Sequence, residues 1–404
     1  MKKIEYLEGL RGTAALVVFF THFLQLFYPA MIYDDISLSP SSIENMLSKS
    51  IFNVFYNGSL AVSIFFVLSG YVLSIKFLKN NDYEVLYSSA ARRYFRLGIP
   101  SAFSILIGFI LLKGNMFYYG EIVDQTNGYF NNHYSSDSSI FEMIKQFLGM
   151  YFISFSKESS LNPVLWTMKY ELLGSFFIFA LMAIFSVFGK RLYVITSYVL
   201  IILVLFSLNY GYFGAFVLGL LISEIENSKY KGIFRESKWS YLILLTGIYF
   251  GSYPYLNIDG SIYGILSYLP FNSVFYHVVG AFLIIVSFQK LKTLQEIFSK
   301  QVFVFLGKIS FSLYLLHYML LFSFSSWLFN ELSKNYSYNT SSLITFLLST
   351  ILLFIVSTLM FKYIDVQSVK ISSKIYAFSF KKIYYSVFKN IRADSKINNR
   401  NHFY

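Results

Sequence analysis

Arg11 and His22 lie on one long apolar stretch near the start of the chain, and their side chains could bind an anion and accept a proton. Their spacing of eleven residues turns an α-helix about 20° beyond three full turns and rises about 16 Å, so both side chains share one face. Because the hydrocarbon core of a bilayer is about 30 Å thick, an arginine near one interface places His22 near the midplane. An ionisable group at that depth indicates a functional site. The alternative is a neutral histidine bonded to a neighbouring helix, beside an arginine that marks the interface.

A second group of candidates is basic. Arg92, Arg93 and Arg96 come directly before a later apolar stretch. Arg93 and Arg96 are three residues apart, so on a helix they extend from one side toward a common anion. As determinants of membrane topology, the same residues would need no ligand.

Polar residues also interrupt two other apolar stretches. Ser69 precedes Gly70, and this small pair permits close helix approach while the hydroxyl can hydrogen-bond across helices, although packing alone also explains it. Glu171 follows Trp166 by five residues, which places an acid about one turn below an aromatic residue at an interface. The lysine and tyrosine between them could equally neutralise and anchor that acid.

A further polar stripe combines a hydroxyl, a phenol and an imidazole. Ser310, Tyr314 and His317 follow one another at i, i+4 and i+7 in an apolar segment. This spacing puts them on one face of a helix, and such a face contacts protein or a cavity and not lipid.

Composition sets the class of protein that must position these residues. Of 404 residues, 56% are hydrophobic, 21% aromatic and only 13% charged, about half the charged fraction of a soluble domain. The chain contains no cysteine, which excludes disulfides, thiolate metal sites and a cysteine-linked acyl intermediate. The net charge of +12 is distributed as expected for a membrane surface, so no nucleic-acid partner is expected. The first apolar stretch has no small-residue cleavage site, so we expect a retained helix.

The apolar stretches between polar breaks predict an all-α polytopic membrane protein of about ten transmembrane helices. Segments on one side of these spans hold 27 of the 33 lysine and arginine residues, so the positive-inside rule places both termini in the cytoplasm. We expect a membrane domain over 1–366 and a basic amphipathic cytoplasmic tail over 367–404. The predicted spans are 10–31, 59–78, 97–113, 164–188, 192–209, 211–224, 239–253, 271–289, 303–329 and 342–363.

The segment 114–163 is the long connection on the outer side, and it is rich in Tyr, Asn and Ser. Its apolar piece from Phe141 to Phe155 is too short to cross a bilayer. The segment is either a re-entrant or interfacial cover over a site, or a solvated loop with a helix on the membrane surface.

Six of these segments, in this order, resemble the motifs of acyltransferase family 3, the integral-membrane O-acyltransferases that modify cell-surface glycans and secreted small molecules. Together the segments extend over about residues 5–366. Gln367 stands where the family often has proline, which leaves the end of the last helix open. The matching segments are Leu7–Gly12 with His22, Phe65–Tyr71, Arg92–Leu97, Leu165–Ser175, Phe303–His317 and Tyr363–Asp365.

The resemblance implies transfer of an acyl group from cytoplasmic acyl-coenzyme A, with acetyl-coenzyme A as the expected donor, to a hydroxyl presented from the other side of the cytoplasmic (inner) membrane. His22 is then the general base, and Arg11, oriented by Glu8, holds donor phosphate or stabilises the developing oxyanion. Arg92, Arg93 and Arg96 would bind the coenzyme A phosphates. No metal is expected. Candidates for the acceptor side or a supporting shell are Ser69, Trp166, Glu171, Tyr314 and His317.

The acceptor stays open on sequence alone, although the aromatic residues of 114–163 could stack on sugar rings and so favour a glycan. The strongest alternative function is a transporter or flippase for a lipid-linked saccharide, with the buried charges as a substrate path. A polysaccharide polymerase would also need many spans and a large outer loop.

Overall fold

The computed structural model describes residues 4–33, 42–127, 130, 133–134, 136–156, 159–188, 190–234, 239–255, 258 and 260–386. These residues form helices and their connections, with no β-strand among them, which confirms the all-α class. The helices of the first half are α1 (Glu5–Phe27), α2 (Ala30–Tyr33), α3 (Ser42–Ser48), α4 (Gly58–Asn80), α5 (Tyr83–Lys113), α6 (Ile140–Gly149) and α7 (Trp166–Phe185). Those of the second half are α8 (Arg191–Ser207), α9 (Gly211–Glu226), α10 (Trp239–Gly251), α11 (Ser273–Lys290), α12 (Lys292–Phe298), α13 (Gln301–Leu320), α14 (Ser326–Ser333), α15 (Tyr338–Met360) and α16 (Val366–Ile375).

Each predicted span corresponds to a helix, but their lengths differ. Among the described residues, seven helical segments are long and apolar enough to cross a membrane. They contain α1, α4, α5, α7, α11, α13 with α14, and α15 with α16. The helices α8, α9 and α10 have 17, 16 and 13 residues, and 13 residues rise only about 20 Å. The count of ten and the orientation of the termini therefore remain predictions.

The two helices that carry the predicted histidines form a tight pair. A Cβ atom at Gly12 of α1 would lie 2.4 Å from the Gly307 nitrogen of α13, and one at Gly307 would lie 2.2 Å from the Glu8 carbonyl oxygen. Neither distance is sterically possible, so both positions require glycine, and the backbones touch as small-residue interfaces in membranes allow. Ten residues further along each helix, His22 and His317 are in contact. The helices are therefore parallel and in fixed register.

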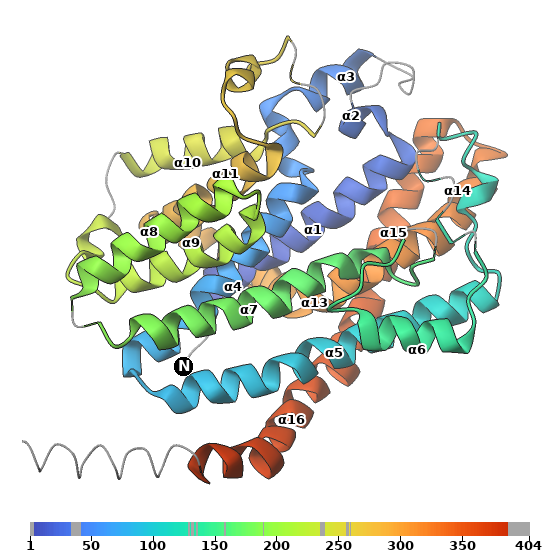
Figure 1. Ribbon diagram of the computed structural model, residues 1–404. Helices are drawn as coiled ribbons and strands as arrows, with labels where there is room; N and C mark the ends of the chain where they lie inside the picture. Colours follow the sequence, from blue (N-terminus) through green and yellow to red (C-terminus); the bar gives the residue numbers. More distant parts are fainter. Residues whose placement is uncertain are drawn as a thin grey trace, which may run out of the picture.

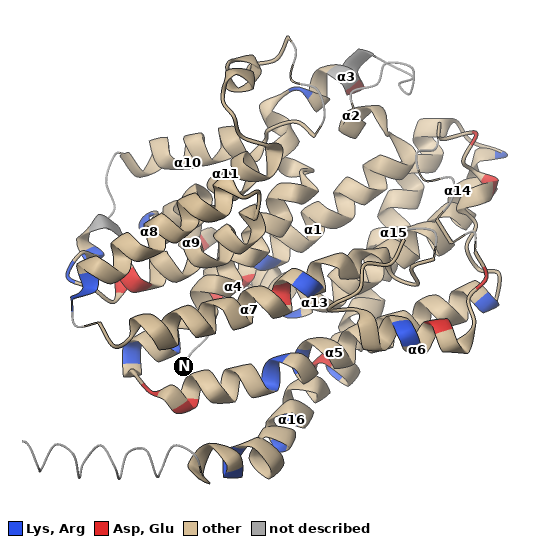
Figure 2. Ribbon diagram, viewed as in Figure 1, with Lys and Arg blue, Asp and Glu red and all other residues tan. Residues whose placement is uncertain are grey.

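The other helices surround this pair (Figure 1). α4 packs on α1 and on α9, and α8, α10 and α11 complete that side of the molecule. α5 packs on α7 and, with α16, forms the opposite side. Lysine and arginine residues mark α5, α16 and the start of α8, whereas long stretches of α10, α11 and α15 carry no charge (Figure 2).

The last helix continues beyond the predicted span. The helix that starts at Tyr338 continues for 49 residues to Ser386, through two short π-helical segments, η8 (Phe361–Asp365) and η9 (Tyr376–Phe380). At 1.5 Å per residue it is about 74 Å long, more than twice the hydrocarbon thickness. The helix continues without a break across residue 366. The predicted boundary between the membrane domain and the tail therefore rests only on the change in amino-acid composition. Residues 387–404 of the predicted tail lie outside the described residues.

Candidate active site

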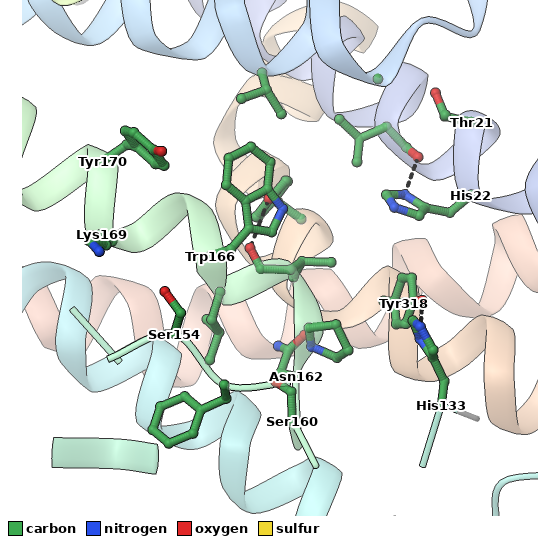
Figure 3. Close-up of a pocket in the computed structure, with 18 of the residues that line it drawn as sticks. Thr21, His22, His133, Ser154, Ser160, Asn162, Trp166, Lys169, Tyr170 and Tyr318 are labelled. Atoms are coloured by element: carbon green, nitrogen blue, oxygen red, sulfur yellow. Dashed lines mark hydrogen bonds between the residues drawn. The ribbon is translucent and has the colours of Figure 1, made fainter. Parts of the chain in front are cut away.

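A cavity of about 530 Å³ lies between α1, α7 and α13 and is closed in part by the segment 130–163. His22 lines the cavity, whereas Lys169 lies on its far side, with Trp166 between them in the view of Figure 3. The contribution of 130–163 favours the predicted cover over a site and not a purely solvated loop. The polar and aromatic lining includes Thr21, His22, Gln25, His133, Asn162, Trp166, Lys169, Tyr170, Tyr314 and Tyr318.

The imidazole of His22 is oriented by two contacts to one nitrogen. His22 Nδ1 lies 2.9 Å from the carbonyl oxygen of Val18 and 3.2 Å from Nε2 of His317. A carbonyl oxygen can only accept, so these contacts assign the proton to Nδ1 and leave Nε2 as the basic nitrogen. That tautomer suits a general base.

His317 lies behind His22 and not in the cavity wall. Its side chain is fully buried, and its Nδ1 donates to the Tyr314 carbonyl oxygen over 2.6 Å. This leaves its Nε2 to accept from His22 Nδ1. On the predicted polar stripe, His317 thus faces protein and contacts His22 from inside the bundle, whereas Tyr314 also lines the cavity.

Tyr314 joins α13 to the start of α7. Its hydroxyl lies 2.9 Å from the Thr167 hydroxyl and donates to the Val164 carbonyl oxygen over 3.0 Å. This bond fixes the turn that brings Trp166 to the cavity, where 47% of the tryptophan is exposed. Ser310 is buried on the same stripe, and its hydroxyl bonds to its own helix at Gly307.

A second polar cluster lies away from the cavity. Glu171 accepts hydrogen bonds of 2.5 Å from both Ser69 and Arg93, and Arg93 also donates to the Ser175 hydroxyl over 2.9 Å. The Arg93 and Glu171 side chains are only 11% and 13% exposed. The cluster links α4, α5 and α7.

This cluster shows the partners of two predicted residues. The spacing of Arg93 and Arg96 predicts a common anion, and Glu171 is a candidate for the acceptor side or a supporting shell. The structure pairs Arg93 with Glu171, and Arg96 is exposed. The physical reason is that a guanidinium buried in a medium of low dielectric constant requires a charged partner, which Glu171 supplies.

The remaining predicted residues are not among those that line the cavity. Arg11 donates to Glu8 over 3.0 Å, as the one-turn spacing predicted. Arg92 donates to the Ser88 carbonyl oxygen over 3.0 Å. Neither arginine is among the residues that line the cavity.

The cover is fixed by contacts that sequence reasoning missed. His133 lies 2.6 Å from the Tyr318 hydroxyl, and Tyr318 contacts the His22 ring edge-on with centroids 5.1 Å apart. At its edge, a hydrogen bond from the Lys113 ammonium lowers the pKa of Asp137 below its usual range. Gln25 and Asn162 were also missed. The position of Gln25 three residues after His22 could have revealed it, whereas no pattern marks Asn162.

Within the described part of the chain, no group of three or more histidine, aspartate or glutamate side chains could hold a metal ion. The carboxylate cluster at Glu171 contains one acid, and the cavity lining contains histidine, amide and hydroxyl groups.

Known proteins similar to this chain are acyltransferases. The chain is 22% identical over 397 residues to "Acyltransferase clz18" of Cochliobolus lunatus and 23% identical over 402 residues to "Acyltransferase R4" of Phoma sp.. Each alignment covers 80% of this chain and 84% of the relative. No solved structure matches the chain significantly. A family model described as an acyltransferase domain matches residues 4–362, and the chain therefore belongs to acyltransferase family 3.

Proposed function

We propose that this membrane acyltransferase is an O-acyltransferase of the cytoplasmic membrane that uses acetyl-coenzyme A, or a related acyl-coenzyme A, as its donor. The acceptor is a hydroxyl group of an extracytoplasmic polysaccharide or other glycan. The observation that carries the proposal is His22, whose Nδ1 is held by Val18 and His317 and whose ring lines a cavity of about 530 Å³. A base fixed in this way beside a cavity is what acyl transfer to a hydroxyl needs.

The chemistry requires two proton transfers, both through His22. The acceptor oxygen attacks the thioester carbonyl carbon as His22 Nε2 takes the hydroxyl proton. Collapse of the tetrahedral intermediate breaks the carbon–sulfur bond, releases the coenzyme A thiolate and leaves the acyl group as an ester. The thiolate takes the proton back from His22, so the base is regenerated.

His317 is a positioning residue in this scheme. By accepting from His22 Nδ1 it holds the ring orientation and stabilises the imidazolium that forms. Arg11 lies about 16 Å along the helix from His22, which is too far for an oxyanion beside His22. We therefore assign Arg11 to the donor and not to the oxyanion.

We also assign the donor phosphates to Arg92 and Arg96, for which no carboxylate partner is seen among the described residues. Arg96 is exposed and Arg92 is half-buried on the first half of α5, and both fit phosphate recognition by guanidinium groups. Arg93 is committed to Glu171, so we assign it to positioning α5 on α7.

Replacement of His22 by alanine tests the proposal. We expect His22→Ala to lower acyl transfer at least 10²- to 10⁴-fold while membrane abundance stays unchanged, because the residue supplies proton transfer and its loss leaves the helix interfaces intact. The measurement is radiolabelled acetyl transfer from acetyl-coenzyme A by equal amounts of protein. Activity within about threefold of the unmodified enzyme would contradict the mechanism.

A further inference from the structure

Asn162 lines the cavity and carries an amide oxygen without a hydrogen-bond partner among the described residues. The residue is fully buried and lines the cavity. Its Nδ2 donates to the Ser104 hydroxyl over 3.0 Å and to the Leu315 carbonyl oxygen over 2.9 Å. Since Leu315 O can only accept, the amide orientation is fixed, and both amide hydrogens are used. Its Oδ1 has no hydrogen-bond partner in the described protein.

Gln25 presents a second such oxygen. It lies one turn beyond His22 on α1, lines the same cavity and is 8% exposed. Its Oε1 is buried and has no partner among the described residues. Gln25 and Asn162 thus both line the cavity that His22 lines, and each carries a buried amide oxygen that lacks a donor among the described residues. Leaving such a group without a hydrogen bond is unfavourable.

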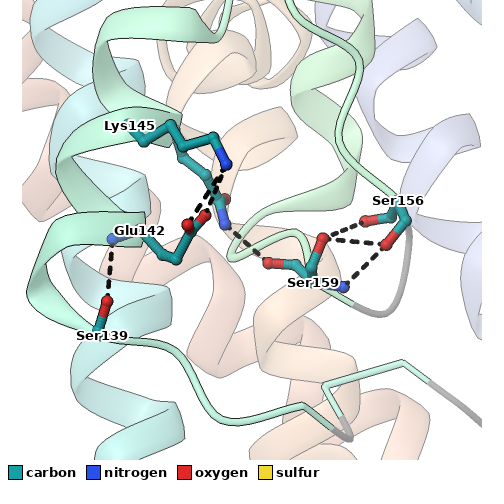
Figure 4. Close-up of polar contacts among 6 residues, drawn as sticks. Ser139, Glu142, Lys145, Ser156 and Ser159 are labelled. Carbon is teal, nitrogen blue, oxygen red and sulfur yellow. Dashed lines mark hydrogen bonds and ion pairs between the residues drawn. The ribbon is translucent and has the colours of Figure 1, made fainter.

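The segment that carries Asn162 is held rigidly. Gln146 of α6 donates to the Ser159 carbonyl oxygen over 2.7 Å and accepts from the Leu161 backbone nitrogen over 2.8 Å. Figure 4 shows Ser156 and Ser159 bonded to one another beside α6, whose first turn is capped by Ser139. The Asn162 oxygen is therefore positioned before any ligand binds, as a specificity site requires.

We propose that Asn162 Oδ1 and Gln25 Oε1 bind hydroxyl groups of the acceptor other than the one that is acylated. The inference rests on the proposed function and names its acceptor class: a ring with several hydroxyl groups, such as a pyranoside. Hydroxyls supply the donors that both oxygens lack, and exposed Trp166 offers an aromatic surface for the apolar face of the ring. An alcohol with one hydroxyl leaves both oxygens unpaired, and sites of this kind reject such analogues strongly.

Acceptor competition tests this inference. The acceptors are the methyl pyranosides of glucose, galactose, mannose and N-acetylglucosamine, with cyclohexylmethanol as a ring of similar size that has one hydroxyl. We expect at least one pyranoside to be acylated with a kcat/KM at least tenfold above that of cyclohexylmethanol. Gln25→Met should raise the KM for that pyranoside about 3- to 10-fold and leave cyclohexylmethanol unchanged.

Two variants control the substitution. Gln25→Glu keeps an oxygen acceptor and should retain most of the pyranoside preference. Gln289→Met makes the same chemical change at a glutamine on α11 whose amide is also buried and unpartnered among the described residues, outside the cavity. It should leave the preference unaltered.

Two failures are distinguishable. If cyclohexylmethanol is acylated as efficiently as every pyranoside, or if Gln25→Met lowers both rates equally, the inference is overturned and the acyltransferase function stands. If the enzyme acylates neither class from any acyl-coenzyme A, the proposed function fails. Calorimetric binding of the pyranosides to His22→Ala then decides the inference separately, since binding weakened by Gln25→Met supports it and binding equal in both proteins contradicts it.

Discussion

One proton on His22 Nδ1 is shared between the Val18 carbonyl oxygen and His317 Nε2, so removal of His317 should affect the chemical step and not substrate binding. A hydrogen bond to a group that becomes charged is worth about 1.5–3 kcal/mol, which corresponds to about a 10- to 100-fold change in rate. We expect His317→Ala to lower kcat by that factor, with the KM values for donor and acceptor within about twofold. Steady-state kinetics in both substrates measures this split.

The conservative change His317→Gln separates positioning from packing. The glutamine amide oxygen can still accept from His22 Nδ1, so this variant should recover most of the lost kcat. An equal loss in both variants, or a loss that appears in KM, would show that His317 has a structural role instead.

At this scale the sequence predicted the polar residues on α1 and α13 but not the whole cavity lining. His22, Tyr314 and His317 could be predicted because helix periodicity determines which face carries a polar group. Asn162 could not, because its role depends on partners 58 and 153 residues away that fix its amide. The spacing of Arg93 and Arg96 predicts that both lie on one helix, and both lie on α5. Spacing alone could not identify Glu171 on α7 as the partner of Arg93.

Among the helices, the buried pair of Arg93 and Glu171 joins α5 to α7. Removing one partner of a buried ion pair leaves an uncompensated charge and typically costs about 3–5 kcal/mol. We expect Arg93→Gln and Glu171→Gln each to lower the temperature of thermal inactivation, and the double variant to recover most of the loss. Fluorescence-detected size-exclusion chromatography after heating measures the inactivation temperature of each variant. If the decreases in inactivation temperature of the two single variants simply added in the double variant, a direct pair would be excluded.

The crossing of α1 and α13 gives a second test at this scale. A side chain at Gly307 would clash with the Glu8 backbone, so Gly307→Leu should separate the two helices and lower acyl transfer at least tenfold through misplacement of His22. Gly264→Ala is the matched control, because a Cβ atom there meets nothing within 4 Å. Full activity of Gly307→Leu would mean that this contact does not position the histidines.

Helix positions could largely be read from apolar stretches, since each of the ten predicted spans corresponds to a helix. Their ends could not be predicted as well. The last helix continues past Asp365 because no proline or glycine stops it at Gln367. In the described part of the segment 114–163, the α-helix extends over Ile140–Gly149.

For the whole molecule, the decisive property is the side of the membrane that the donor site and the cavity cover each face. The charge distribution predicts that Arg96 faces the cytoplasm and that the cavity cover faces out, so the acyl group and not the acceptor must cross the membrane. In sealed inside-out vesicles, labelled acetyl-coenzyme A added outside should esterify an acceptor trapped in the lumen. Vesicles that contain His22→Ala serve as the control and should show no labelled ester.

A transporter would give a different result in the same vesicles. Accumulation of an unmodified saccharide across the membrane in the absence of donor would contradict the acyltransferase and support transport. Labelling of an acceptor supplied on the donor side alone would contradict the proposed orientation.

The parallel register of α1 and α13 constrains how this sequence can change in length. Ten residues separate glycine from histidine in both helices, from Gly12 to His22 and from Gly307 to His317. One residue inserted between them in either helix would rotate its histidine by about 100° and move it about 1.5 Å, without altering the hydropathy of the span. Such an insertion would leave the predicted membrane topology unchanged but would break the contact between the two histidines. Only a matched insertion in both helices restores the pair, so two segments 295 positions apart must keep the same length.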